Sequence, residues 1–272
     1  MKKMRVAITG SSGMVGSALS AFLQEKGHTV LPIAREGITD KASLGEIDAV
    51  FHLAGENIGS GRWTKNKKKR ILSSRVEGTK LLVNTLNSLK NPPKVLISAS
   101  AVGYYGLNTP SPCDESFPPG DDFLATVCVK WEAEAKKFRE GRCVIPRLGV
   151  VLSSSGGALK KMLKPFSLGL GGVVGKGNQI LSWIALDDVI QLLYQILLDE
   201  TVSGPVNLCS PYPVTNYEFT KTLGCILNRP TVFPLPAFVA KVAFGEMARA
   251  TLLSSCIASP KVLLDKDYSF KY

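Results

Sequence analysis

A glycine-rich segment near the N-terminus has the residue types and spacing of an anion-binding loop. Glycines recur every third residue in Gly10-Ser11-Ser12-Gly13-Met14-Val15-Gly16, between an apolar run (4–9) and apolar residues at helical spacing (15–23). The first glycine would permit a tight turn, the second the approach of a diphosphate, and the third close packing of the helix on the strand. The N-terminus of the helix would direct free backbone N–H groups at the anion. We therefore expect a dinucleotide cofactor to bind at Gly10, Ser11, Ser12, Gly13, Met14 and Val15.

The residues after the second expected strand indicate which dinucleotide is favoured. An acidic side chain there binds the ribose 2′-hydroxyl of NAD, whereas an arginine accommodates the 2′-phosphate of NADP. The strand 29–34 is followed by Arg35, and Glu36 comes one residue later. The hydroxyls of Ser11 and Ser12 would add donors to the extra phosphate. The sequence thus favours NADP over NAD, although a shift of one residue at the strand end would reverse this choice.

The third expected strand, 48–53, brings further residues to the same edge of the sheet. It ends in His52-Leu53-Ala54-Gly55. The small residues would let the chain pass close to the adenosine ribose, so we expect Leu53, Ala54 and Gly55 to contact the cofactor. His52 lies within the strand and is expected to be packed in the core rather than catalytic.

Strands and helices alternate along the first part of the chain. Apolar runs predict strands over 4–9, 29–34, 48–53, 94–98 and 143–152, with amphipathic helices between them. This alternation is typical of an α/β doubly wound (Rossmann) parallel sheet with helices on both faces. We expect a dinucleotide-binding domain over 1–152. Residues 153–272 are expected to form a substrate-binding loop and a smaller α+β subdomain, interleaved with the core as one compact unit, with a helix over 238–250.

The overall composition excludes several classes of protein. Of the 272 residues, 45% are hydrophobic and 20% charged, as in a folded globular chain. No apolar stretch reaches the ~20 residues of a membrane span, and the N-terminus lacks the apolar region of a signal peptide. The six cysteines form no CxxC pair, and both histidines are far from them in sequence. We therefore expect reduced thiols, no metal site, no membrane association and a cytoplasmic location.

Positive charge is concentrated in one short segment. Eight basic residues stand against Glu77 alone, namely Arg62, Lys65, Lys67, Lys68, Lys69, Arg70, Arg75 and Lys80. Such a segment attracts anions, including nucleic acid. Because no aromatic or groove-reading pattern accompanies it, a solvated helix face is favoured over nucleic-acid binding.

Three motifs together resemble the extended, or atypical, short-chain dehydrogenases/reductases. They are GSSGMVG at 10–16, HLAGENI at 52–58 and SASAVGYYG at 98–106. Further segments, such as Trp131-Glu132 and Gly156-Gly157-Ala158, resemble the epimerase-like branch with a C-terminal domain of unknown function, from Met4 to about Tyr268. The resemblance implies an NADP-dependent nucleoside-diphosphate-sugar epimerase or oxidoreductase. Some members of that branch are labelled cell-division-inhibitor homologues.

The resemblance also implies a catalytic serine, tyrosine and lysine, the last two at positions i and i+4 of one helix. Ser100 matches the serine, and Lys130 matches the lysine, which would also bind the nicotinamide ribose. Thr126 then occupies the tyrosine position, and a threonine hydroxyl is too weak an acid to exchange protons near neutral pH. We therefore expect Tyr104 to replace the tyrosine, with Tyr105 beside it facing the substrate.

Two polar residues further along are expected to help bind the substrate. Arg147 and Trp183 lie near the glycine- and lysine-rich loop 156–177, which would cover an anionic, ring-bearing substrate such as a nucleotide sugar. A strand-end salt bridge is an equally good interpretation of Arg147, and core packing is the alternative for Trp183.

Three functional hypotheses remain open from the sequence. The first is an NADP-dependent oxidoreductase or epimerase acting on a sugar-like or nucleotide-linked substrate. The second is a non-catalytic NADPH-binding protein that reports the redox state to a partner, which Thr126 favours. The third, nucleic-acid binding through 62–80, is the least supported. A homodimer is inferred by analogy with the fold.

Overall fold

The computed structural model describes residues 3–272 and contains one central parallel sheet. Its strands lie in the order β10-β6-β4-β3-β1-β2, and short β5 (Ser100–Ala101) continues β4 alongside β6. The six main strands are β1 (Arg5–Thr9), β2 (Thr29–Ile33), β3 (Ala49–His52), β4 (Val95–Ser98), β6 (Arg142–Leu148) and β10 (Gly204–Leu208). This arrangement confirms the predicted doubly wound α/β fold.

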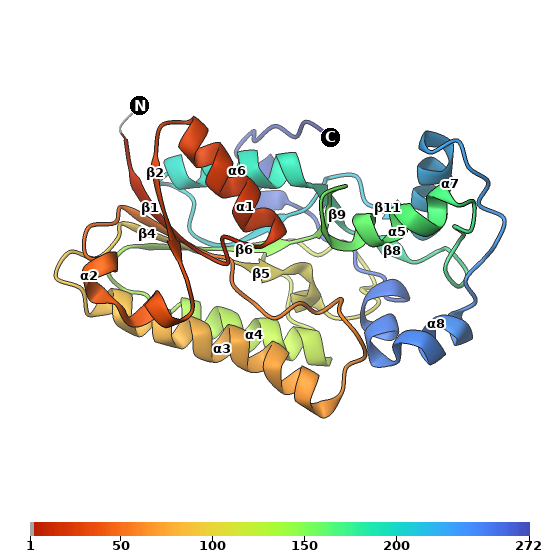
Figure 1. Cartoon of the computed structure of the whole chain (residues 1–272), viewed down its shortest axis with the longest axis horizontal. Coiled ribbons are helices and arrows are strands. Elements are labelled where there is room, and N and C mark those ends of the chain that lie inside the picture. The colour runs from red at the N-terminus through yellow and green to blue at the C-terminus, as the bar shows by residue number, and fades with distance from the viewer. Residues whose placement is uncertain (1–2) are drawn as a thin grey trace.

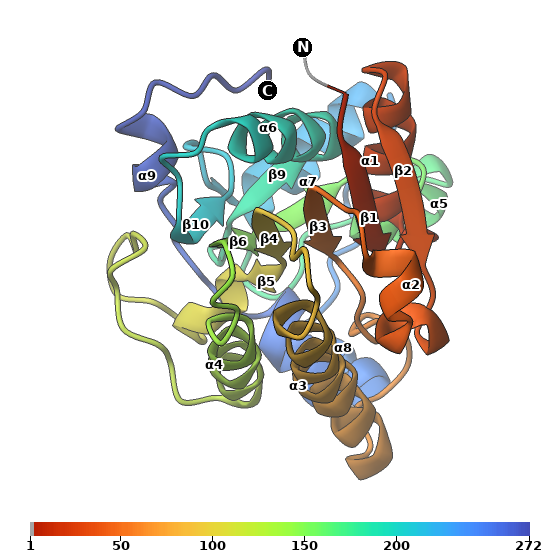
Figure 2. The same ribbon diagram turned by 90° about the vertical axis from the view of Figure 1, so that its left-hand side faces the viewer.

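Helices cover both faces of this sheet (Figures 1 and 2). One face carries α1 (Met14–Glu25) and α6 (Leu186–Leu198), whose apolar residues share a core with β1 and β3. The other face carries α3 (Lys65–Asn87) and α4 (Phe123–Ala135), which lie side by side. The 3₁₀ turn η1 (Glu36–Thr39) and α2 (Lys41–Leu44) lie on the same face as α3, where Ile38 and Leu44 share a core with Leu82. The 3₁₀ turn η2 (Val102–Tyr105) follows β5.

The remaining elements form a smaller lobe beyond the carboxyl ends of the strands (Figure 1). Its helices are α5 (Gly157–Ser167), α7 (Asn216–Ile226) and α8 (Ala237–Phe244). Two strand pairs accompany them: antiparallel β8 (Ile180–Leu181) with β11 (Val214–Thr215), and parallel β7 (Val150–Leu152) with β9 (Trp183–Ala185). The main sheet extends to residue 208, because β10 belongs to it, and α6 covers one of its faces. The domain boundary at residue 152 stays a prediction.

Two expected elements have different bounds in the structure. The expected strand over 143–152 is interrupted at Gly149, where an added Cβ would lie 2.9 Å from the Ser182 carbonyl oxygen. The expected helix over 238–250 ends at Phe244, because Gly245 takes a φ of +63°. A π-helical turn, η3 (Ala248–Leu252), follows it.

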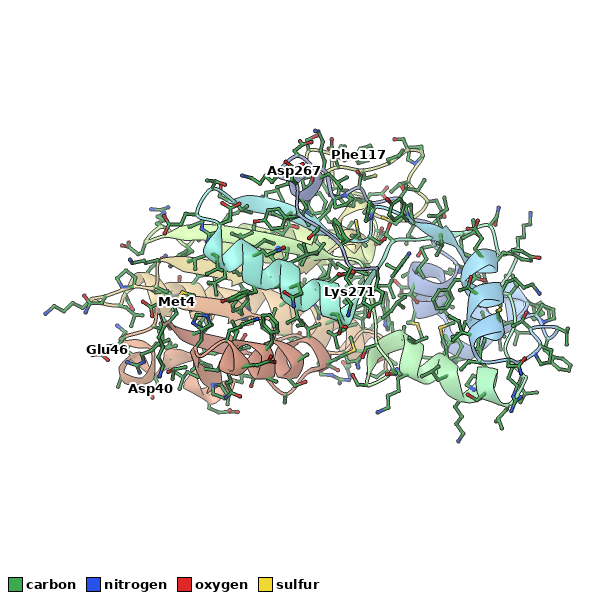
Figure 3. The ribbon with its side chains drawn as sticks, turned by 90° about the horizontal axis from the view of Figure 1, so that it is seen from above. Met4, Asp40, Glu46, Phe117, Asp267 and Lys271 are labelled. Carbon is green, nitrogen blue, oxygen red and sulfur yellow. The ribbon has the colours of Figure 1, made fainter. Side chains whose placement is uncertain are left out.

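The C-terminal segment closes the molecule by returning to α6. It includes α9 (Lys261–Leu264), and the backbone N–H groups of Lys271 and Tyr272 donate to the Asp188 carboxylate (Figure 3). No helix among residues 3–272 combines the length and the hydropathy that crossing a bilayer requires.

His52 occupies the core end of β3, as expected from the sequence. Its side chain is fully buried, and its two ring nitrogens hydrogen-bond the hydroxyls of Thr9 (2.6 Å) and Thr79 (2.8 Å). Burial lowers the pKa of His52 from 6.5 to about 4. The ring is therefore neutral at physiological pH and cross-links β1, β3 and α3.

This buried ring should make stability fall in mild acid. The unfolded chain binds a proton at His52 near pH 6.5, whereas the folded chain binds it only near pH 4. The free energy of unfolding should therefore fall by about 3 kcal/mol as the pH is lowered from 6.5 to 4. His52→Gln keeps a neutral amide and removes the titration. Urea unfolding at pH 7.0, 5.5 and 4.5 should therefore show a shallower pH dependence for the variant, and parallel profiles would contradict this assignment.

Candidate functional site

The glycine loop joins β1 to α1 with very close backbone contacts. Gly10 has a φ of +73°, and a Cβ there would come within 2.8 Å of the Ala54 nitrogen. A Cβ on Gly16 would lie 2.2 Å from the Gly10 carbonyl oxygen. Only glycine fits either position, so the loop, the helix and the end of β3 are held together backbone to backbone.

The N-terminus of α1 is open to a ligand. Gly13 precedes the helix and is exposed, and no side chain caps the first turn at Met14 and Val15. The first N–H groups of a helix have no partner within it, so an uncapped N-terminus attracts an anion. An added Cβ on Gly13 would meet only the Gly10 carbonyl oxygen, at 3.2 Å, so the space above this glycine is open. The loop fits a dinucleotide diphosphate.

Arg35 lies where its side chain could bind the 2′-phosphate of NADP. Thr9 and Ile33 pair in register, so Ser11 and Arg35 each lie two residues beyond the same rung of adjacent strands. Arg35 is exposed, and within residues 3–272 its side chain makes no hydrogen bond or ion pair. Glu36 begins the next turn, η1. The role of Arg35 in cofactor choice stays a prediction.

The end of β3 adjoins the loop, as the sequence predicts. The Leu53 N–H donates to the Thr9 carbonyl (3.1 Å), and Ala54 touches Gly10. On its other side, Gly55 lies against the Arg75 guanidinium, where an added Cβ would be 3.0 Å from the Arg75 Cζ. The predicted cofactor residues of β1 and β3 therefore form one continuous surface.

The start of α5 covers this surface from the second lobe. A Cβ on Gly156 would lie 3.0 Å from the Met14 sulfur, so this segment crosses the N-terminus of α1. The Lys161 ammonium donates to the Gly59 carbonyl at 2.5 Å, which links α5 to the loop after β3. The part of the 156–177 loop that forms α5 thus lies over the cofactor loop.

Ser100 belongs to a buried polar network that the sequence did not reveal. Its hydroxyl donates to the Glu132 carboxylate at 2.8 Å. The same carboxylate accepts two hydrogen bonds from Arg147, from Nε at 2.8 Å and from a terminal nitrogen at 2.9 Å. All three side chains are at most 2% exposed. Glu132 therefore fixes both Ser100 on β5 and Arg147 on β6.

Arg147 was wrongly assigned to substrate binding. It forms a buried bidentate ion pair, and its remaining hydrogen bonds are to the Tyr105 hydroxyl (3.0 Å) and the Glu115 carbonyl (3.2 Å). Burial alone would lower its pKa, but the hydrogen bonds and charge of Glu132 raise it. The interpretation as a strand-end salt bridge was correct, since Arg147 is the second-last residue of β6, and the pair is buried.

The two adjacent tyrosines have different environments. Tyr105 is 4% exposed and donates to the Asn207 amide oxygen at 2.7 Å, and burial raises its pKa, so its assignment to substrate binding is also corrected. Tyr104 is only partly buried, with its ring 3.5 Å from the Arg147 guanidinium carbon. Its hydroxyl makes no hydrogen bond within the described chain, so Tyr104 is the tyrosine that remains available.

The predicted catalytic positions on α4 do not face the site. Lys130 and Thr126 are exposed, and the Thr126 hydroxyl donates to the Asp122 carbonyl of its own helix. The residue beside Ser100 is instead Cys128, and Leu124, one turn earlier, contacts Gly103. The apolar stripe of α4 faces β5 and η2, so the same face serves packing and the site. The lysine position is therefore taken by a thiol.

Cys128 is a neutral, inward-facing group. Burial and the charge of Glu132 raise its pKa to about 11, while Ser100 and the charge of Arg75 act in the opposite direction. Trp183, the last predicted substrate residue, is partly buried and donates from its indole nitrogen to the Tyr212 carbonyl at 2.9 Å. Its role toward substrate stays a prediction.

No cluster among residues 3–272 has the side chains to hold a metal ion.

Much of the basic segment 62–80 is engaged within the molecule. Lys67 is buried and pairs with Glu56 at 2.6 Å, and Lys68 pairs with Glu246 of the second lobe at 2.7 Å. Arg62 donates to the carbonyls of Val242 and Ala243 near the end of α8. These contacts tie the start of α3 to the second lobe and leave fewer cations for an external polyanion.

The Glu132–Arg147 pair should be strongly coupled energetically. Either single change, Glu132→Leu or Arg147→Met, leaves one buried charge without its partner and should lower the free energy of unfolding by about 3–5 kcal/mol. The double variant should lose much less than the sum of the singles, as measured by urea denaturation. Lys261→Ala, at an exposed ion pair, is the control and should change little. Additive losses would show that the pair is not a coupled unit.

The comparisons with known proteins agree with this geometry. Residues 6–209 match the NAD dependent epimerase/dehydratase family, and residues 235–272 match a domain of unknown function, DUF1731. The chain is 40% identical to an epimerase family protein of Mycobacterium bovis, over 98% of this chain and 93% of that protein. It is 36% identical to the human epimerase family protein SDR39U1, over 99% of this chain and 96% of that protein.

Two solved structures of relatives can be superimposed on nearly all of this chain. The crystal structure of human SDR39U1 with NADPH has a TM-score of 0.92 at 36% identity, covering 99% of this chain and 95% of that one. A nucleoside-diphosphate sugar epimerase from Corynebacterium glutamicum has a TM-score of 0.80 at 34% identity, covering 100% of this chain and 56% of that one. The family match over residues 6–209 includes the glycine loop and, except for Arg5, all six main strands of the sheet. This protein belongs to the NAD dependent epimerase/dehydratase family, with a C-terminal DUF1731 segment.

Proposed function

We propose that this protein binds NADP(H) at the N-terminus of α1 and acts as an oxidoreductase or epimerase on a sugar-like or nucleotide-linked substrate. The uncapped first turn of α1, held beside Ala54 by Gly10 and Gly16, carries this proposal. Two relatives support it: human SDR39U1 was crystallised with NADPH, and the Corynebacterium glutamicum relative is named a nucleoside-diphosphate sugar epimerase.

Each part of the loop surface has a distinct task in this proposal. The N–H groups of 13–15 bind the diphosphate, and the hydroxyls of Ser11 and Ser12 with the guanidinium of Arg35 bind the 2′-phosphate. Leu53, Ala54 and Gly55 pack beside the adenosine ribose. When bound, the cofactor supplies or accepts a hydride. NAD would lack the group that Arg35 is placed to bind.

The residues nearest the reacting atoms are proposed to be Ser100 and Tyr104. Tyr104 would exchange the substrate proton, because its hydroxyl has no partner within residues 3–272 while its ring is held against Arg147. Ser100 is buried and donates to Glu132, so in this proposal it must become accessible when substrate binds in order to orient the substrate hydroxyl. Lys130 is withdrawn from the catalytic and cofactor sites, since it is exposed on the outer face of α4.

The non-catalytic alternative has one specific observation in its favour. Leu124 and Cys128 occupy the helix positions that face the site, where a tyrosine and a lysine were sought. A redox-reporting protein would bind NADPH without turnover. A single-turnover experiment separates the two hypotheses. The protein is mixed with NADPH and each of a panel of nucleotide sugars, and NADPH absorbance and solvent-deuterium incorporation are followed. If no substrate of the panel gives either signal, the non-catalytic alternative is favoured.

Location and assembly are also proposals. We infer a cytoplasmic protein from the composition and from six free thiols, three of which are buried. A homodimer through α3 and α4 is proposed by analogy, since these helices lie side by side on one face of the sheet (Figure 2).

Arg35→Asp tests the choice of cofactor. Loss of a charge-assisted contact to the 2′-phosphate should weaken NADPH binding by about 2 kcal/mol, or about 30-fold, and leave NADH binding nearly unchanged. Calorimetric titration of both cofactors measures this. Arg139→Asp, an exposed arginine after α4, is the matched control for net charge. Equal losses for both cofactors would place the selecting residue elsewhere.

Gly13→Val tests the diphosphate site itself. The added side chain would fill the open space above the uncapped turn, so binding of NADPH and of NADH should both be abolished. Gly78→Ala, where nothing lies within 4 Å of the added Cβ, should retain both affinities. A Gly13→Val protein that folds and still binds NADPH with unchanged affinity would refute the site.

A further inference from the structure

Arg75 differs from the rest of the basic segment because it faces inward. It lies in the middle of α3 and is partly buried, with its guanidinium carbon 5.1 Å from the centre of the Trp131 ring on α4. Lys67, Lys68 and Arg70 each pair with a carboxylate, and Lys69 is exposed. Arg75 has no carboxylate partner and is only partly exposed to water.

Arg75 forms no ion pair within residues 3–272, although the charge of Glu56 acts on it from a greater distance. One terminal nitrogen donates to the carbonyls of Glu56 (3.0 Å) and Ile71 (3.3 Å), and no carboxylate oxygen lies within 4.0 Å. The Glu56 carboxylate is engaged by Lys67 at 2.6 Å and by Arg70 at 3.6 Å instead. Nε and the other terminal nitrogen make no hydrogen bond within the same residues. Burial lowers the pKa of Arg75, as expected for a cation withdrawn from water.

The position of Arg75 links the two halves of the site. On one side it touches Gly55, which is exposed and has no side chain to shield the guanidinium. Gly55 follows Ala54, the residue that packs on the cofactor loop. On the other side the charge of Arg75 acts on the Cys128 thiol, which adjoins Ser100. The guanidinium thus lies between the cofactor loop and Ser100, where α4 offers no cation of its own.

We propose that Arg75 is the cation of this site and binds an anionic oxygen group, a phosphate or a carboxylate, of the ligand. A buried charge is normally paired, and a guanidinium with Nε and one terminal nitrogen free presents two parallel donors that match two oxygens. The proposal rests on the proposed function in one respect, since it places the anion beside the NADPH site. The anion is either part of NADPH or part of the substrate.

The Arg75 Nε–H signal in nitrogen-15 NMR tests this directly. Arg75→Lys identifies the signal by its loss, and wild-type protein in anion-poor buffer is titrated with NADPH and then with inorganic phosphate and acetate. A shift that saturates with NADPH alone assigns the anion to the cofactor, and one that needs phosphate or acetate assigns it to the substrate. No saturable shift with any of the three overturns the proposal.

Affinity measurements on variants show whether the shift reports binding. For the anion that produces it, Arg75→Met should weaken binding about ten- to hundredfold, Arg75→Lys should retain part of it, and Lys69→Met on the same helix should bind as wild type. Equal affinity of wild type and both Arg75 variants overturns the proposal, and Arg75→Lys suffices if Arg75→Met does not fold. If the wild-type protein does not bind NADPH, the proposed function is refuted. The titrations with phosphate and acetate still test the proposal for Arg75 in that case.

Discussion

The site depends on one backbone-to-backbone contact, in which Gly10 touches both Gly16 and Ala54. Neither glycine leaves room for a Cβ: at Gly16 it would lie 2.2 Å from the carbonyl oxygen of Gly10. This contact directs the uncapped first turn of α1 across the carboxyl edge of the sheet. Since Arg35 and Ser11 extend equally beyond paired residues of β2 and β1, the same contact sets where a second phosphate would be read.

A buried ion pair organises the other half of the site. Glu132 holds Ser100 and Arg147, and Arg147 in turn supports the Tyr104 ring and the Tyr105 hydroxyl. Tyr105 also donates to Asn207 on β10, so the network reaches from α4 through η2 to the last strand of the sheet. Such a network costs desolvation but fixes its members in a single arrangement. The position of Tyr104 is therefore determined by Glu132 and Arg147, which are themselves buried.

The fold and the glycine loop could be predicted because they depend on local patterns. The glycine loop is predicted by the spacing of Gly10, Gly13 and Gly16. The fold is predicted by the alternation of apolar strands with amphipathic helices. Each pattern is visible within a short stretch of sequence. The register of α4 could not be predicted this way, because its apolar stripe serves both packing and the site. The sequence therefore placed Lys130 at the site, where the structure has Cys128. Arg147 was ambiguous for a similar reason: its partner, Glu132, is distant in sequence.

Arg75 shows the same limit from the other direction. In the sequence it is one of eight basic residues in a segment typical of a solvated face. Only the packing of α3 against α4 and the absence of a side chain at Gly55 separate it from its neighbours. A charge count cannot distinguish an inward cation from an outward one, whereas burial and the distribution of nearby carboxylates can.

The central claim is that the first-turn amides of α1 bind the dinucleotide diphosphate. Titration of ligand-stripped, nitrogen-15-labelled protein with NADPH, followed at each backbone amide, tests it most directly. We predict saturable shifts that are largest at Gly13, Met14 and Val15. Saturable shifts confined to other parts of the chain, or no shift at all, would contradict the account.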